Sequence, residues 1–149
     1  MRVWIIASLA GTLLALSAPA LAAPPSEQCP QPRFTGRAPD PDYGYSNPLS
    51  ASKENLSAAK KMYLGKDGHF GCENCHGKKG EGNGPLASQY DPRPRNFACP
   101  QTVRAIPDGQ LFWIIRNGSP DTGMPPHPEY SEVEMWRLVL YIRLLADQK

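Results

Sequence analysis

Two cysteines and a histidine have a spacing that can do chemistry, in the segment Cys72-Glu-Asn-Cys75-His76. On one turn of helix, cysteines three residues apart face the same way, and the adjacent histidine presents an imidazole nitrogen beside them. Two such thiols can each form a thioether to a vinyl group, while the imidazole ligates a metal. C-x-x-C-H is the spacing of haem c attachment, so the segment predicts one covalently bound haem c.

Three other chemistries compete for this motif. A thioredoxin-like redox pair needs a βαβ context, of which the sequence shows none. A zinc site needs a second pair of ligands, and Cys29 and Cys99 are not spaced as one. A structural disulfide between Cys72 and Cys75 leaves the adjacent His76 without a role. Haem attachment, with His76 as an axial ligand of the iron, uses all three residues of the motif.

A second axial ligand is expected from the C-terminal third of the sequence. Methionine together with histidine raises the reduction potential of a haem iron. Met124 lies in a loop, Gly123-Met-Pro-Pro126, whose prolines can hold a thioether against the far face of the haem. Met62 and Met135 fall within helical patterns and are expected in the core. His127 is the alternative ligand and would give a bis-histidine iron of lower potential. A second alternative is that Met124 is an exposed residue of a turn and does not bind the iron.

Residues 1–22 have the pattern of an export signal. Arg2 gives a positive start, an almost wholly apolar run follows, and Ala20 and Ala22 form a small-residue cleavage site. The alternative is a retained membrane anchor, but the apolar run is shorter than the roughly 20 residues that span a bilayer. Removal of this signal peptide leaves 15 Lys and Arg against 14 Asp and Glu, which excludes a strongly basic nucleic-acid binder. We expect an exported protein, soluble in the periplasm.

The remaining cysteines, Cys29 and Cys99, are expected to form a disulfide. Haem attachment consumes Cys72 and Cys75, and an oxidising compartment favours a bond between the two thiols that are left. The bond would pin the N-terminal arm to the long loop after the motif. A free Cys29, or one that joins two molecules, is the alternative.

The elements that must position these residues read as all-α. Residues 23–51 are rich in proline and poor in aliphatic side chains, so they are expected to form an extended, irregular arm before a domain over residues 52–149. The glycines and prolines of residues 77–107 predict a loop, and no segment alternates like a strand.

Three helices are expected from local signals. Ser52 is a candidate N-cap for a helix from Lys53 to about Leu64. Asp108 is a candidate cap for a helix over residues 110–116, which Asn117-Gly118 ends. Ser131 and Glu134 form an S-x-x-E capping box before a last helix that reaches Leu145 or Ala146.

The order of motifs resembles that of class I bacterial monohaem cytochromes c. The resemblance covers about residues 52–146 and rests on the C-x-x-C-H motif, the loop Gly82-Asn-Gly-Pro85, and Gly123-Met-Pro125. It implies a small cytochrome c fold whose helices pack around the covalently bound haem. The first and last helices would cross beside the haem, with Tyr63 and Trp136 or Tyr141 near the contact. It also implies that the Pro85 carbonyl accepts a hydrogen bond from the His76 ring.

One-electron transfer between redox partner proteins is the function that these expectations favour. The sequence shows no paired catalytic carboxylates, so we expect an electron carrier rather than an enzyme, either free as a monomer or as a subunit of a larger redox complex. Arg93 and Arg95 lie between the two ligands in sequence and are candidate partners of the haem propionates; a solvated basic turn is the alternative. A gas-binding haem and a thiol oxidoreductase are the rival functions.

Overall fold

The computed structural model describes Met1, residues 28–32 and residues 35–148. The expected signal peptide, apart from Met1, and the first residues of the arm lie outside the described residues. Throughout the described part the chain is helical and contains no strand, so the expected all-α, small cytochrome c fold is confirmed. No helix in these ranges is long and apolar enough to cross a lipid bilayer.

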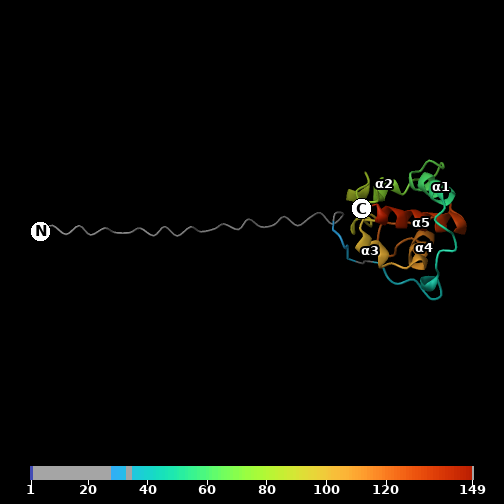
Figure 1. Ribbon diagram of the computed structural model, residues 1–149, viewed down its shortest axis with the longest axis horizontal. Helices are drawn as coiled ribbons and strands as arrows, with labels where there is room; N and C mark the ends of the chain where they lie inside the picture. Colours follow the sequence, from blue (N-terminus) through green and yellow to red (C-terminus); the bar gives the residue numbers. More distant parts are fainter. Residues whose placement is uncertain (2–27, 33–34, 149) are drawn as a thin grey trace.

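The elements surround one central helix. α5 runs through the middle of the molecule, with α1 and α2 on one side and α3 and α4 on the other (Figure 1), and it contacts α1, α3 and α4. In chain order the elements are η1 (Asp42–Gly44), α1 (Lys53–Tyr63), α2 (Glu73–His76), η2 (Ala87–Gln89), α3 (Pro100–Arg104), α4 (Asp108–Asn117) and α5 (Glu132–Asp147), where η marks a 3-10 helix.

Local capping explains where α1 and α5 begin, as expected. The Ser52 hydroxyl accepts a hydrogen bond from the Asn55 backbone N–H at 3.2 Å. The predicted capping box is present at α5, because Ser131 N donates to the Glu134 carboxylate at 2.8 Å and Glu134 N donates to the Ser131 hydroxyl at 3.4 Å. These bonds satisfy backbone donors that have no partner within the helix.

Aromatic pairs hold α5 against its neighbours. The rings of Tyr63 on α1 and Tyr141 on α5 lie 5.1 Å apart, at the crossing of the first and last helices. The Trp136 ring stacks on Phe112 of α4, with 4.2 Å between centroids. Of the two candidates for the α1 contact, the structure thus pairs Tyr141 with Tyr63 and turns Trp136 towards α4.

Two expectations for the middle of the chain are wrong. The predicted loop over residues 77–107 contains η2 and α3, and Pro100 starts α3 because the missing proline N–H costs nothing in a first turn. Asp108 is not the cap of α4: it is the first helical residue, after Pro107 at the N-cap. Its carboxylate accepts instead from Asn47 N at 3.3 Å and from Arg143 of α5.

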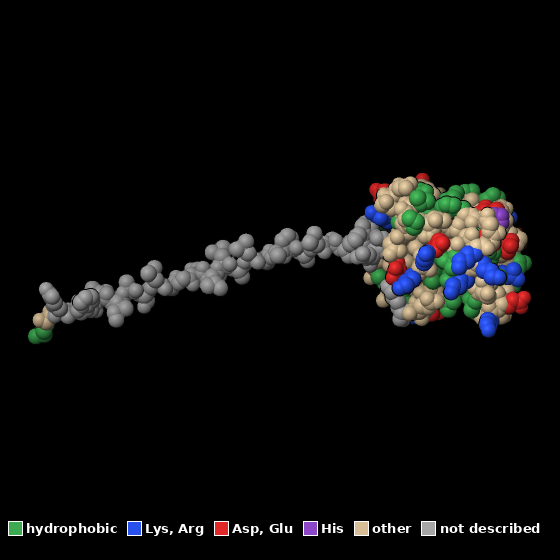
Figure 2. Space-filling model, turned by 90° about the horizontal axis from the view of Figure 1, so that it is seen from above, with side chains coloured by type: hydrophobic (Ala, Val, Ile, Leu, Met, Phe, Trp, Pro, Cys, Tyr) green, Lys and Arg blue, Asp and Glu red, His purple; other side chains and the backbone are tan. Residues whose placement is uncertain are grey.

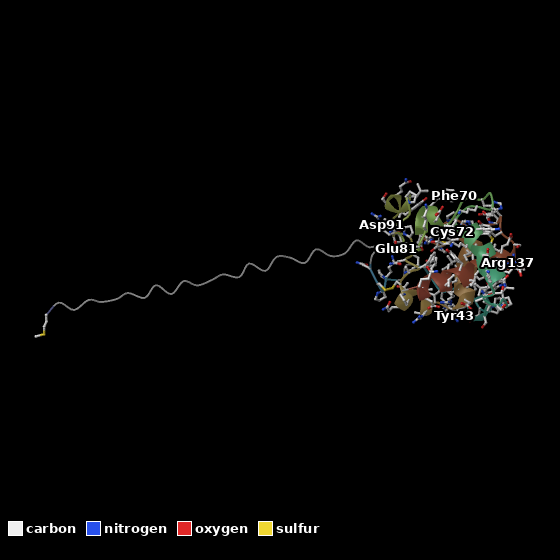
Figure 3. The ribbon with its side chains drawn as sticks, turned by 45° about the horizontal axis from the view of Figure 1, so that its top comes forward. Tyr43, Phe70, Cys72, Glu81, Asp91 and Arg137 are labelled. Atoms are coloured by element: carbon white, nitrogen blue, oxygen red, sulfur yellow. A yellow bond between two sulfur atoms is a disulfide. The ribbon has the colours of Figure 1, made fainter. Side chains whose placement is uncertain are left out.

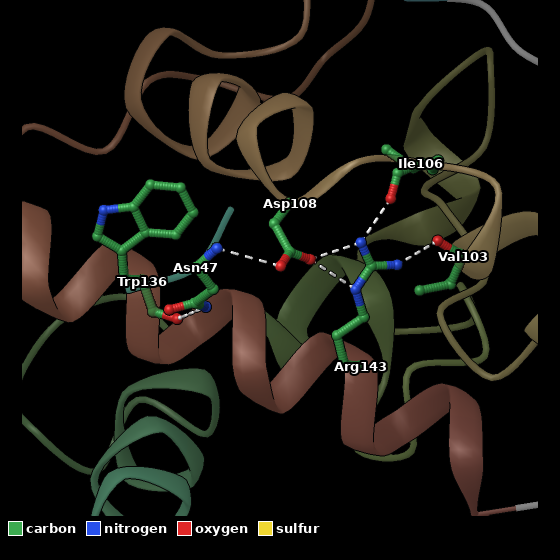
Figure 4. Close-up of polar contacts among 6 residues, drawn as sticks. All are labelled: Asn47, Val103, Ile106, Asp108, Trp136 and Arg143. Carbon is green, nitrogen blue, oxygen red and sulfur yellow. Dashed lines mark hydrogen bonds and ion pairs between the residues drawn. The ribbon is translucent and has the colours of Figure 1, made fainter. Parts of the chain in front are cut away.

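The side chain of Arg143 connects α5 with the turn between α3 and α4. Its guanidinium binds the Asp108 carboxylate and also donates to the carbonyl oxygens of Val103 and Ile106 (Figure 4). Asn47 of the arm joins the same network through its backbone N–H, which donates to the Asp108 carboxylate, and its side-chain amide also donates to the Trp136 carbonyl at 2.9 Å. The network fixes the start of α4, a helix that lines the candidate site.

Residues 35–51 of the arm lie against α4. Gln110 is 1% exposed. Its side-chain amide oxygen accepts a hydrogen bond from Ala38 N at 2.7 Å, and its amide nitrogen donates to the Gly36 carbonyl at 3.3 Å. Gly109 N donates to the Tyr45 carbonyl at 2.9 Å, and a side chain at Gly109 would collide with the backbone of η1. Hydrogen bonds therefore fix an arm whose composition provides little apolar surface to bury.

Candidate functional site

The cysteine–histidine motif forms α2, a single helical turn. Cys72 is at its N-cap, and the backbone N–H groups of Cys75 and His76 donate to the Cys72 carbonyl at 3.2 Å and 2.9 Å. Gly77, with a φ of 79°, ends the turn in a conformation that favours glycine. All three functional side chains line the same cavity. Figure 3 shows Cys72 beside Phe70 on the side of this view opposite to Tyr43.

The ring of His76 is buried and fixed on two sides. Its Nδ1 lies 3.0 Å from the Arg95 carbonyl oxygen. Because a carbonyl can only accept, Nδ1 carries the proton and Nε2 is the nitrogen left to ligate a metal. The Phe97 ring stacks on the imidazole, with 4.3 Å between centroids. Burial lowers the pKa of His76 to about 4, so the imidazole is neutral at neutral pH, the form that can bind iron.

The acceptor for His76 was expected at Pro85, and that prediction is wrong. The loop after the motif folds beneath α2, where Gly82 N, Gly84 N and Leu86 N donate to carbonyl oxygens of the turn at 2.8 Å, 3.1 Å and 2.9 Å. A side chain at Gly84 would collide with the carbonyl oxygens of Glu73 and Asn74 in α2. This pairing places Pro85 on the exposed outer surface. The carbonyl that reaches the His76 ring is therefore that of Arg95, ten residues after Pro85.

Met124 lies on a constrained loop that lines the same cavity. Ser119 N donates to the Met124 carbonyl at 3.1 Å, and Met124 N donates to the Thr122 hydroxyl at 3.2 Å. The Tyr90 ring packs directly against Gly123, where a Cβ would not fit. The thioether of Met124 packs partly buried against the hydrophobic core. These contacts give the loop a defined position at the wall of the cavity.

His127, the alternative ligand, also lines the cavity. Its Nδ1 lies 2.9 Å from Glu129 Oε1, and its backbone N–H donates to the Ile115 carbonyl at 3.1 Å. The structure thus brings His76, Met124 and His127 to one cavity, as the sequence predicts for a ligand and its two candidate partners.

The cavity itself is apolar and has a volume of about 370 Å³. Ligand pockets in proteins are of this order, typically about 300 to 1,000 Å³. Its apolar side chains come largely from α4, α5 and the loops before α3 and α4, among them Phe97, Ile106, Leu111, Ile114, Ile115 and Leu138. Such a wall suits a flat, hydrophobic ring system better than a polar metabolite.

Comparison with known proteins agrees with this geometry. Residues 69–142, which include the motif, Met124 and most of α5, match the family model for cytochrome c oxidase, cbb3-type, subunit III. The match supports a c-type cytochrome domain in this segment. The comparison with curated proteins gives no match to the chain.

A solved structure shares the architecture of the cytochrome domain. It is a chain of the reducing HAO-like protein complex of Kuenenia stuttgartiensis, with a TM-score of 0.55 and 28% sequence identity. The alignment covers 66% of this chain and 46% of that chain, so this chain spans less than half the length of the chain that it matches.

The residues of the cytochrome domain fit covalently bound haem c. Cys72 and Cys75 form no disulfide with each other, which leaves both thiols for thioether bonds. Burial raises the pKa of the Cys72 thiol to about 12 and also raises that of Cys75. Reactive redox thiols need a lowered pKa, so these values disfavour the thiol oxidoreductase alternative. Among the described residues no group of three or more His, Cys, Asp or Glu side chains is arranged to hold a metal ion.

Arg93 and Arg95 both lie at the wall of the cavity, in the loop that precedes Phe97. Arg95 also donates from Nη1 to the Pro32 carbonyl of the arm at 3.0 Å. The sequence did not assign a role to the Arg95 backbone, to Phe97 or to Tyr90, because none of them belongs to a motif. The positive φ of Gly82, which faces the Pro94 carbonyl, marks the close approach of the two loops, but a lone glycine in a glycine-rich loop gives no such signal in the sequence.

Proposed function

We propose that this protein is an exported electron carrier with one haem c, attached through Cys72 and Cys75 and ligated by His76 and Met124. The observation that carries the proposal is that the two thiols, the imidazole and the thioether on the constrained loop all line one apolar cavity. The c-type cytochrome domain over residues 69–142 supports electron transfer as the activity.

The residues have separate tasks in this proposal. When bound, haem c supplies a one-electron Fe(III)/Fe(II) couple. Cys72 and Cys75 hold it covalently, which lets a small domain keep it without a deep pocket. His76 offers Nε2 because Arg95 fixes the proton on Nδ1. Met124 provides a soft thioether that favours Fe(II) and raises the potential.

A visible spectrum tests this ligation directly. The proposal expects a low-spin iron in both oxidation states, with a sulfur-to-iron band in the Fe(III) form. Two protein ligands would leave no open coordination position for a substrate or a gas, which is why the proposed activity is transfer rather than catalysis. A high-spin spectrum would favour the gas-binding alternative, and a low-spin spectrum without the sulfur band would favour His127.

Arg93 and Arg95 are proposed as partners of the haem propionates. Both line the cavity, and an arginine guanidinium binds carboxylates with paired, charge-assisted hydrogen bonds. Replacement of each by Gln should change how the reduction potential depends on pH, because a lost cation makes propionate ionisation less favourable. An unchanged dependence in both variants would assign them to a solvated basic turn.

Redox proteins of the periplasm are the proposed partners. Basic and acidic side chains are interspersed on the face shown in Figure 2, so this face has no single-sign field that would select a partner. The similar chain of Kuenenia stuttgartiensis is part of a protein complex, which supports a role as a dedicated subunit; a free carrier is the alternative. Co-purification from native periplasm, followed by reduction of the haem with each candidate enzyme, distinguishes a dedicated subunit from a free carrier.

A further inference from the structure

The first described residues of the arm lie on the loop that carries the Arg95 carbonyl. Gln31 Oε1 accepts a hydrogen bond from Asn96 N at 2.7 Å, and Gln31 Nε2 lies 3.5 Å from the Pro94 carbonyl. Arg95 Nη1 donates to the Pro32 carbonyl at 3.0 Å. The amide of Gln31 therefore contacts the backbone on both sides of Arg95, and the Arg95 side chain reaches back to the arm.

Gln31 is itself anchored to the domain. Its backbone N–H donates to the Thr102 hydroxyl of α3 at 2.9 Å. Two residues earlier, Cys29 is joined to Cys99 by a disulfide, with Cα atoms 5.5 Å apart. Because one anchor is the N-cap of α3 and the other lies within that helix, the Gln31 amide has a fixed position relative to the core.

The arm completes the restraint of the loop beside His76. On the C-terminal side, Phe97 N and Ala98 N donate to the Gly80 carbonyl at 2.5 Å and 3.2 Å. These bonds fix the loop from Phe97 onward, but they act beyond Arg95. The bonds from Gln31 act directly at the two peptide groups that flank Arg95 and so limit rotation of its carbonyl.

We infer that Gln31 is a positioning residue for the haem iron, acting through the Arg95 carbonyl on the His76 imidazole. This inference rests on the proposed function, in which His76 ligates the iron. A fixed acceptor at Nδ1–H raises the basicity of a ligating imidazole. A more basic imidazole stabilises Fe(III), so the Gln31 contact lowers the reduction potential. The proline-rich arm thereby has a role in redox tuning.

The test compares four variants with the wild-type holoprotein. Gln31→Leu removes both contacts of the amide, and Gln31→Asn keeps an amide that is too short to reach. Gln31→Glu keeps the 2.7 Å acceptor for Asn96 N. Gln89→Leu removes an exposed glutamine of η2 and is the matched control. The measurements are the reduction potential and, by NMR on the Fe(II) form, the exchange rate of the His76 Nδ1–H.

The Leu and Asn variants should raise the potential and speed the exchange of the ring proton about fivefold, the ratio that corresponds to a hydrogen bond of roughly 1 kcal/mol. The Glu variant should have a potential equal to or below that of the wild type, because its added negative charge also favours Fe(III). The control should match the wild type. If the Gln31→Leu variant folds poorly, the Gln31→Asn variant gives the same comparison with the wild type.

The outcomes separate this inference from the proposed function. A wild-type protein that lacks covalent haem would overturn both. If the wild-type haem has the expected spectrum, unchanged potential and exchange in the Leu and Asn variants would overturn the role of Gln31 alone. A rise in potential for Gln31→Glu as large as for Gln31→Leu would also overturn it, since the acceptor for Asn96 would then not matter.

Discussion

Arg143 of α5 binds Asp108, the first residue of α4, through Nε at 2.8 Å and Nη2 at 2.6 Å (Figure 4). The same guanidinium donates to the carbonyl oxygens of Val103 and Ile106, each at 2.5 Å. These carbonyls lie where α3 ends, and groups at helix ends need partners from outside the helix. One side chain thus fixes the turn that leads into α4 and its cavity-lining residues.

Replacement of Arg143 by Leu should lower the free energy of unfolding by about 2 to 3 kcal/mol. The change removes four charge-assisted hydrogen bonds and leaves the half-buried Asp108 carboxylate without its main partner. Denaturant unfolding of the holoprotein measures the loss. Arg104→Leu is the matched control, since its pair with Asp147 is exposed and should contribute less than about 1 kcal/mol. Equal losses in the two variants would contradict the assigned role of the network.

Removal of the α5 cap should make stability less dependent on pH. The hydrogen bonds from the side chain and backbone of Ser131 lower the pKa of Glu134. This carboxylate therefore stabilises the fold above its unfolded pKa of about 4.3, and the contribution is lost as the pH falls through the folded pKa. Ser131→Ala should cost about 1 kcal/mol at pH 7 and progressively less below about pH 4.

Ser52→Ala is the control for the cap of α5. Ser52 caps α1 in the same way, but the residue three positions later is Asn55, which does not ionise. Ser52→Ala should lower the free energy of unfolding by a similar amount at pH 7, and this decrease should be nearly constant with pH. Parallel pH curves for the two alanine variants would show that the Glu134 bond contributes nothing to stability.

Replacement of Met124 by Ala should open one axial position of the iron. The Fe(III) spectrum should lose its sulfur band, the reduction potential should fall, and carbon monoxide or imidazole should bind readily. Titration with imidazole, followed in the visible spectrum, measures the change. His127→Ala is the comparison, because His127 lines the same cavity and should leave the spectrum intact. An unchanged Met124→Ala spectrum beside an altered His127→Ala spectrum would assign the ligand to His127.

The bond between Cys29 and Cys99 should be present within each monomer. Non-reducing peptide mapping should recover the two cysteines in one linked species from native protein. The bond closes a loop with a sequence separation of 70, which corresponds to roughly 4 kcal/mol of stabilisation in the chain-entropy treatment. Cys29→Ser should therefore unfold at a much lower denaturant concentration. Two alkylated free thiols, or a Cys29 peptide linked between two molecules, would contradict the prediction.

Helices with local signals could be predicted from the sequence, and those that depend on distant contacts could not. The Ser52 and Ser131 caps are encoded within four residues, and apolar side chains at helical spacing follow each cap. α3 has five residues and no such periodicity, so it is stable only because it packs on α5. Its position inside a proline-rich stretch made a loop the better prediction.

The candidate site also combines residues that have local sequence signals with contacts that depend on distant parts of the chain. The motif from Cys72 to His76 is local, and Met124 follows from its glycine and proline neighbours. The partner of His76 depends instead on how three segments distant in sequence meet. The loop after the motif turns Pro85 outward, and Gln31 and His76 reach the segment around Arg95 from two separate parts of the chain. No spacing rule relates residues that are brought together only by folding of the whole domain.

Covalent attachment of one haem is the central claim, and mass spectrometry of the denatured protein tests it most directly. After unfolding and extraction with acidic acetone, the peptide that contains Cys72 and Cys75 should retain the mass of one haem, and Cys72→Ala with Cys75→Ala should abolish it. Release of all the haem into the acetone, or a peptide with the mass of two unmodified cysteines, would contradict the account.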